Sequence, residues 1–181
     1  MLKKLRILLV LILGFGGNSF AISKTDYFTE INYLKNYISN PVKVGEGSFS
    51  FFFWDIYDAK LYADNGNFSQ EKPFALKLRY QMSFKGEDIV KSTIDELKKH
   101  GVTDELLLSK WQKDLLKIFP DVNENQILTG VYTDKKTAVF LNNGKIIGEM
   151  KDEYFAKKFF EIWLSEKTTA PSLRKSLLAR K

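Results

Sequence analysis

The stretch SFFFWDIYDAKLY, residues 50–62, places four aromatic residues in succession and then two carboxylates. A strand with one face in water alternates apolar and polar side chains. In this stretch the first half is apolar at odd and even positions alike. We therefore interpret residues 42–63 as a strand in the middle of a sheet. Helices would cover one face, and a loop, a second layer or a ligand would cover the other.

The segments after this stretch indicate the rest of the architecture. Residues 74–84 alternate as a strand with one buried and one polar face, with Arg79 on the polar face and Tyr80 on the buried one. Two amphipathic helices are expected over 85–101 and 103–120. Short strands, helices and turns complete the pattern over 126–133, 137–142, 145–150, 152–165 and 170–180. This order predicts an α+β fold with a mainly antiparallel sheet.

The N-terminus has the pattern of a secretory signal peptide. A basic start is followed by a short apolar run at Ile7–Phe15 and by small residues before a cut near Ala21. The alternative is an uncleaved anchor helix, although the run is short for a membrane span. We expect a signal peptide over 1–21, one domain over 22–181, and no stable membrane anchor after cleavage.

The amino-acid composition limits which binding partners and which cellular compartment fit the chain. The whole chain has a formal net charge of +6, from 28 basic and 22 acidic residues. Without the three basic residues of the signal, 25 basic residues face 22 acidic ones, a charge of about +3. Few arginines and dispersed lysines argue against nucleic-acid binding. The absence of cysteine excludes disulfides, and an exported chain of this kind suits the periplasm or secretion.

The side chains present argue against a catalytic triad, a metal site and a cofactor site. His100 is the only histidine, and we expect it to be exposed at a helix end, which argues against a catalytic triad. Without cysteine or a second histidine we expect no metal site, and no motif indicates a cofactor. Asp55 and Asp58 are three residues apart, so a regular strand places them on opposite faces. Either could be a carboxylate in an aromatic pocket or a structural side chain. Arg79 is either exposed or able to hold a ligand carboxylate.

Five segments of the sequence resemble a known family. They are VGEGSFSFFFWDIYDAKLYA, PFALKLRY, the helix after FKGEDI, LTGVY and NNGKIIGEMKDEYFAKKFFEIWLSEKTTAPSLRKSLL. They are similar to the bacterial chalcone isomerase-like proteins, exported relatives of plant chalcone isomerase and of the plastid fatty-acid-binding proteins. The resemblance implies a chalcone isomerase-like fold, in which a large antiparallel sheet is backed by helices. It also implies a ligand cleft between these two layers.

The resemblance also implies which residues would matter. In the plant enzyme, an Arg on an early strand holds and polarises the substrate during intramolecular ring closure. In the fatty-acid binders, an Arg and a Tyr bind the carboxylate. The corresponding segment here, KVGEGSFSFFF, contains no Arg; its only cation is Lys43, and Tyr57 stands where the family has a Thr. Without the guanidinium, we expect no flavanone-forming activity.

Three functional hypotheses follow. The first is a non-catalytic periplasmic protein that binds a small apolar or amphipathic ligand such as a fatty acid. Its cleft would be lined by aromatic residues and anchored by a polar group from Tyr57, Arg79 or Lys43. The second is an isomerase or lyase with Asp55 or Tyr57 as acid or base, and the third is a ligand-free interaction module. The aromatic candidates for the cleft are Phe53, Trp54, Tyr57, Tyr80 and Trp111.

Overall fold

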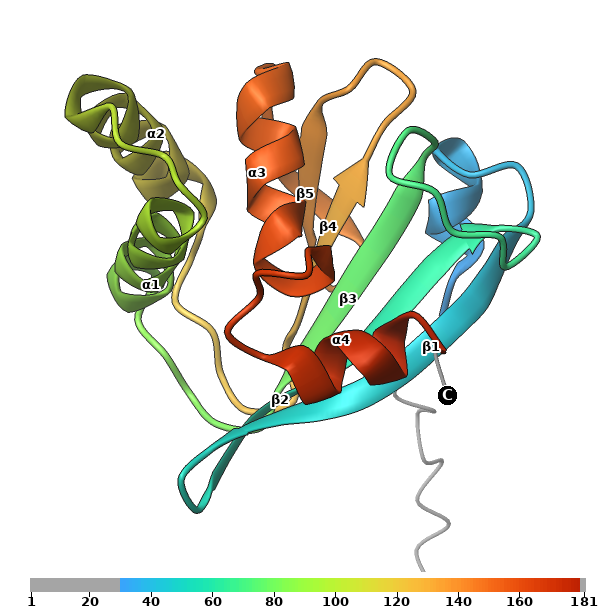
Figure 1. Ribbon diagram of the computed structural model, residues 1–181. Coiled ribbons are helices and arrows are strands. Elements are labelled where there is room, and N and C mark those ends of the chain that lie inside the picture. Colours follow the sequence, from blue (N-terminus) through green and yellow to red (C-terminus); the bar gives the residue numbers. More distant parts are fainter. Residues whose placement is uncertain (1–29, 180–181) are drawn as a thin grey trace, which may run out of the picture.

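The computed structural model describes residues 30–179, so the expected signal peptide lies outside the described residues. Six strands form one antiparallel sheet in the order β1-β2-β3-β4-β5-β6 (Figure 1). Along the chain, α1 and α2 come between β3 and β4, which pair directly in the sheet. The elements are η1 (Asn32–Asn36), β1 (Pro41–Phe51), β2 (Trp54–Asp64), β3 (Phe74–Tyr80), α1 (Gly86–Lys99), α2 (Glu105–Ile118), β4 (Ile127–Tyr132), β5 (Ala138–Asn142), β6 (Lys145–Met150), α3 (Glu153–Leu164) and α4 (Pro171–Leu177).

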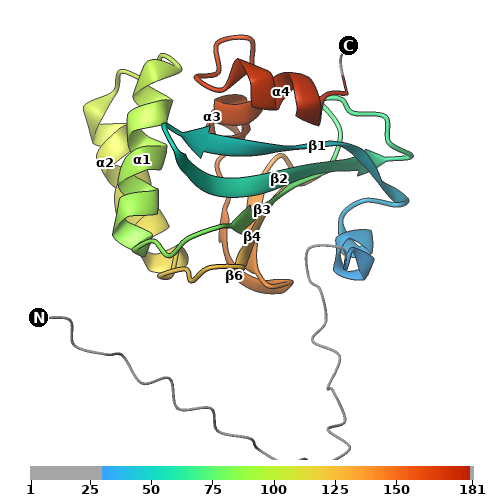
Figure 2. The same ribbon diagram turned by 90° about the horizontal axis from the view of Figure 1, so that it is seen from below.

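Each face of the sheet has its own apolar cluster. The larger cluster joins β2–β6 to the four α-helices, with Trp111, Phe155 and Leu177 fully buried in it. The smaller cluster lies on the opposite face, where Leu34 and Ile38 pack against Val131 (Figure 2). We call these the helix face and the outer face. This architecture confirms the α+β class and the antiparallel sheet.

The structure corrects the interpretation of residues 42–63. They are not one central strand but a hairpin, because β1 and β2 pair antiparallel and turn at Phe52 and Phe53. The two strands are the first two of the sheet, at its edge rather than in its middle. The aromatic run lies at the turn of this hairpin and is exposed there, so no core covers either of its faces.

The strand and helices that follow agree with their sequence patterns. Alternate β3 residues from Phe74 to Tyr80 join the cluster on the helix face. α1 carries acidic residues in its first turn and lysines in its last, which complement the helix dipole. Asp152 caps α3, since its carboxylate accepts a hydrogen bond from the Phe155 amide at 3.0 Å. None of the described helices is long and apolar enough to span a bilayer.

His100 does not lie where the sequence analysis expects it. The side chain is 5% exposed, and its Nδ1 lies 3.0 Å from the carbonyl oxygen of Glu96. The backbone carbonyl of His100 accepts a hydrogen bond from Lys158 Nζ on α3, at 3.4 Å. The end of α1 is thus buried against α3, and the expectation of an exposed histidine is wrong.

The final helix closes the fold by packing on the first strand. A Cβ atom on Gly45 would overlap the backbone carbonyl oxygens of Ser176 and Leu177. A Cβ on Gly47 would lie 2.9 Å from Cβ of Ser176. The two glycines therefore allow α4 to approach the backbone of β1 more closely than any side chain would permit.

We expect Gly45→Ala to destabilise the protein by about 1–3 kcal/mol, because the added methyl group must push α4 away from β1. Chemical denaturation followed by circular dichroism measures this change. Lys175→Ala, on the exposed side of α4, is the control and should leave stability within about 0.5 kcal/mol. An unchanged midpoint for Gly45→Ala would show that the close approach does not contribute to stability.

Candidate functional site

A bulge in the hairpin decides which side chains face the helices. Phe49 pairs with Tyr57 while Ser50 pairs with Asp55, so Ile56 is an extra residue in β2. Asp58 and Asp55 bond to Ser48 and Ser50 respectively, each at 2.6 Å. Ser48 and Ser50 are two residues apart on one strand, so both carboxylates lie on the outer face. The prediction that the two acids lie on opposite faces is therefore wrong.

The same register gathers aromatic rings on the helix face. We define the aromatic strip as Phe49, Tyr57, Tyr80, Phe84 and Trp163. The ring of Tyr57 stacks on Phe49 at 5.3 Å and meets Tyr80 edge-on at 6.1 Å. Phe84 continues the strip 5.6 Å beyond Tyr80. Tyr80 is buried and the other four are partly buried, so the strip runs from the core towards the surface.

Two phenols give the strip a polar element. Burial raises the pKa of Tyr57 to about 12, although the hydrogen bond from Trp163 opposes the rise. That bond runs from Trp163 Nε1 to Tyr57 Oη at 2.9 Å. Burial also raises the pKa of Tyr80. Both hydroxyls are therefore protonated at neutral pH, and the Tyr57 hydroxyl can accept from Trp163 while donating to a ligand oxygen.

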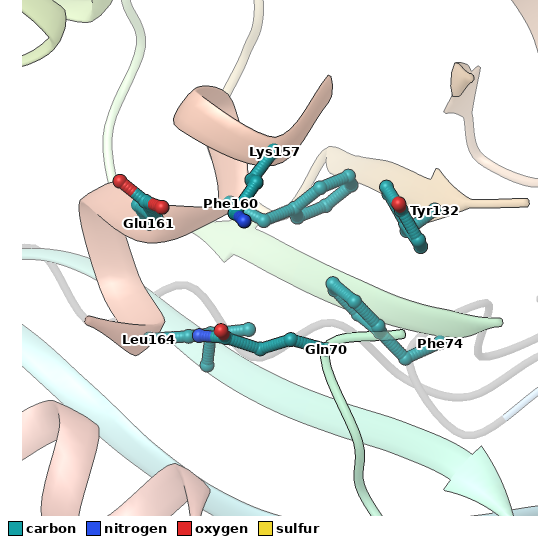
Figure 3. A pocket seen from close by; sticks show the side chains of 7 residues that line it. All are labelled: Gln70, Phe74, Tyr132, Lys157, Phe160, Glu161 and Leu164. Carbon is teal, nitrogen blue, oxygen red and sulfur yellow. The ribbon is translucent and has the colours of Figure 1, made fainter. Parts of the chain in front are cut away.

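A small pocket lies beside α3 on the helix face. Figure 3 shows Phe160 of α3 facing Tyr132 and Phe74 of the sheet, with Lys157 and Glu161 on the same helix. Its volume is about 10 Å³, which is room for about one water molecule. Typical ligand pockets have about 300–1,000 Å³. Side chains must therefore move before this pocket can take an organic ligand.

A wider hollow of about 300 Å³ lies on the outer face. Asp58 is its polar centre, since it accepts hydrogen bonds from Ser48, from Arg79 at 2.8 Å and from Gln81 at 2.6 Å. Burial by itself would raise the pKa of Asp58, but these three bonds and the Arg79 charge hold it below its usual value. The lining residues are Glu46, Gly47, Ser48, Asp58, Ala59, Lys60 and Arg79.

The charges in this hollow balance one another. Arg79 pairs with Asp58, and Glu46 lies 2.8 Å from Lys43 and 3.8 Å from Lys60. The hollow is thus polar without excess positive charge, and an anionic ligand would have to compete with carboxylates already in place. Such a hollow does not select for a carboxylate.

The structure separates the seven residues that the sequence nominates for a ligand site. Phe53, Trp54 and Asp55 lie at the hairpin turn and are exposed. Tyr57 and Tyr80 meet in the aromatic strip. Arg79 lies on the outer face, and Trp111 is fully buried, with its Nε1 donating to Asp152 at 2.9 Å. Only the two tyrosines share a site, and their role in binding stays a prediction.

The sequence did not predict two members of the aromatic strip or one buried lysine. Phe49 and Trp163 complete the aromatic strip. Strand alternation could have indicated Phe49, because it lies two residues before Phe51 and so points to the same face of the sheet. Trp163 was recognisable only as part of an apolar helix stripe, since its hydrogen bond to Tyr57 spans 106 residues. Lys77 is fully buried on the outer face, where its Nζ donates to the Glu30 carbonyl oxygen at 2.6 Å.

Comparisons with known proteins agree with this architecture. Residues 44–179 match the model of a family described as chalcone isomerase-like. Among solved structures, the chain is similar to a fatty-acid binding protein of Arabidopsis thaliana, with 15% sequence identity and a TM-score of 0.60. That match covers 77% of this chain and 87% of the other. A search of curated proteins found no significant match.

The buried phenol of Tyr57 predicts a loss of stability in alkali. Its pKa is about 12 in the folded chain against an ordinary 10.0, so the unfolded chain ionises first as the pH rises. Stability is therefore lost progressively between about pH 10 and 12. We expect Tyr57→Phe to reduce this alkaline loss by on the order of 1–3 kcal/mol. Urea unfolding at pH 8 and pH 11.5 measures the loss in the free energy of unfolding. An equal loss in the wild type and in Tyr57→Phe would show that Tyr57 is not the group responsible.

Proposed function

Because this chain belongs to the chalcone isomerase-like family, we propose that it is an exported, non-catalytic binding protein for a small amphipathic ligand. A fatty acid is the ligand class that fits best. The apolar chain of the ligand would lie on the aromatic strip, and its polar end would accept a hydrogen bond from Tyr57. The export signal expected over 1–21 supports a periplasmic location.

The observation that carries this proposal is the aromatic strip itself. Tyr80 is buried and the other four rings are partly buried, and the strip includes the protonated phenol of Tyr57. Aromatic surface with a small number of placed polar groups is typical of sites for apolar ligands. A protein of the same fold is named as a fatty-acid binding protein, which supports the same class of ligand.

The positions of the arginines support a non-catalytic role. The described residues contain two, and both make bonds away from the aromatic strip. Arg79 binds Asp58 on the outer face, and Nε of Arg174 donates to the Leu164 carbonyl oxygen at 2.8 Å. A developing enolate on the strip would therefore lack a guanidinium to stabilise it.

The acid–base candidates from the sequence are poorly placed for catalysis. Tyr57, with a pKa of about 12, is almost entirely protonated at pH 7 and is a poor base there. Asp55 is exposed at the hairpin turn, where Ser50 donates a hydrogen bond to it. Neither residue pairs with a second catalytic group on the strip. These positions favour binding over the isomerase alternative.

Native mass spectrometry of protein recovered gently from the periplasm tests binding and export together. We expect a chain that begins near Ile22 and carries a bound species with the mass of a fatty acid. Denaturing the same sample should release that species, because the binding is noncovalent. An intact chain found only in the cytoplasm would contradict export, and a bare mass at every mild condition would contradict binding.

Displacement of a fluorescent fatty acid locates the ligand. We expect Phe49→Ala to weaken binding by about tenfold, since it removes one ring of contact from the strip. Arg79→Gln, on the outer face, is the matched control and should bind with unchanged affinity. The reverse pattern, with Arg79→Gln impaired and Phe49→Ala normal, would place the ligand in the outer hollow and refute the assignment.

The purified protein should not convert chalcone to flavanone above the uncatalysed rate. The physical reason is the missing guanidinium, since preorganised positive charge contributes most of the stabilisation of an enolate. Absorbance of chalcone over time at pH 7.5 measures this. Conversion that is faster with protein, and that Tyr57→Phe abolishes, would establish an enzyme instead.

A further inference from the structure

The turn of the β1–β2 hairpin exposes four consecutive aromatic residues. The exposed fractions are 60% for Phe51, 83% for Phe52, 99% for Phe53 and 65% for Trp54. In Figure 1 this turn projects from one end of the sheet, at the lower left. Isolated exposed apolar side chains are ordinary on protein surfaces, but a contiguous set indicates an interaction site.

The chain holds this turn in a defined shape. Phe52 has a φ of 53°, in the left-handed region that bulky residues seldom adopt. Its ring meets that of Phe51 edge-on at 4.7 Å. Directly behind the turn, Ser50 Oγ donates to Asp55 at 2.6 Å and ties the two strands together on the outer face. The aromatic side chains are therefore presented on a short, closed hairpin.

We propose that this aromatic turn is a membrane-interface anchor that inserts among the headgroups and upper acyl chains of a phospholipid bilayer. The four side chains would enter the bilayer together, and the bonded pair Ser50–Asp55 would remain at the level of the headgroups. Insertion of a turn this short reaches about 5–10 Å, which is the depth of interfacial segments. The contact is shallow and reversible.

Three features favour a lipid surface over a protein partner. The turn projects from the end of the sheet (Figure 1), and the ring planes of Phe51 and Phe52 stand at 80° to each other, so the two rings do not form one flat face. A fluid apolar medium can surround such a shape, whereas a protein would need a matching pocket. Residues 47–54 carry no charge, and the first carboxylate is Asp55. Phe and Trp are also the residues that interfacial segments use, and Trp is enriched at membrane interfaces.

The overall charge of the chain suits the same partner. Without the three basic residues of the expected signal the chain carries about +3, and this positive charge favours approach to anionic lipids. Because the anchor depends on apolar insertion, vesicles of neutral lipid should still bind, but more weakly. The anchor does not depend on the proposed ligand. The register places Phe51 and Trp54 on the same face as the aromatic strip. If the chain also binds the proposed ligand, that ligand could pass from the lipid to the protein along this face.

The absence of cysteine allows the anchor to be tested at one position at a time. Phe53→Cys and Leu106→Cys are each labelled with an environment-sensitive NBD dye. Leu106 is 85% exposed on α2 and serves as the matched control. The probe is vesicles of phosphatidylethanolamine and phosphatidylglycerol, 3:1, without fatty acid. We expect a blue shift, and quenching by nitroxide-labelled lipid, at position 53 but not at 106.

A second pair of variants measures the contribution of the turn to binding. We expect Phe52→Ser combined with Phe53→Ser to lower vesicle partitioning by about tenfold or more, because two inserted rings are lost. Ile146→Ser, at a 65% exposed site on β6, should change it little. All variants keep the same N-terminal residues, so any contribution of those residues cancels.

The outcomes separate the anchor from the ligand site. If the dye at position 53 stays in water at saturating vesicle concentration, the turn is not a membrane anchor. A protein partner would then be the molecule that binds the turn. Equal responses at 53 and 106, or unchanged partitioning of the double serine variant, also overturn it. Since these vesicles hold no fatty acid, a failure of the proposed ligand function leaves each of these results unaffected.

Discussion

The extra residue in β2 is the constraint on which the arrangement of the site depends. Without Ile56 as a bulge, Ser50 would pair with Ile56 and Phe51 with Asp55, so Asp55 would face the helices. The bulge keeps Ser50 and Asp55 on the outer face, with Ser48 and Asp58, while Phe49 and Tyr57 face the helices. One inserted residue thus separates a polar surface from an aromatic one.

Much of the fold could be predicted from local pattern. The structure confirms the alternation predicted for β3. The charges at the two ends of α1 and the Asp152 cap likewise depend on residues close together in sequence. The hairpin turn could not be predicted in the same way. SFFFWD contains no Gly, Asn or Pro to mark a turn, and Phe52 adopts a left-handed φ that its side chain does not favour.

The site was harder to predict because its chemistry depends on distant contacts. Alternation correctly places Lys77 and Arg79 on the same face of β3, but it cannot show that the η1 region covers one of them. Lys77 is fully buried, with its ammonium 5.1 Å from the ring of Tyr33, while Arg79 binds Asp58 in a hollow. The burial of His100 against α3 has the same origin in tertiary packing.

The close approach of α4 to Gly45 and Gly47 has a consequence for biosynthesis. The helix that covers the first strand is also the last of the described helices to be synthesised. Until residues 171–177 emerge, the helix-facing side of β1 has no cover, and the apolar hairpin remains open to misassociation. The first strand is therefore covered only once the last of the described helices has formed, so β1 and α4 depend on each other although they lie at opposite ends of the described residues.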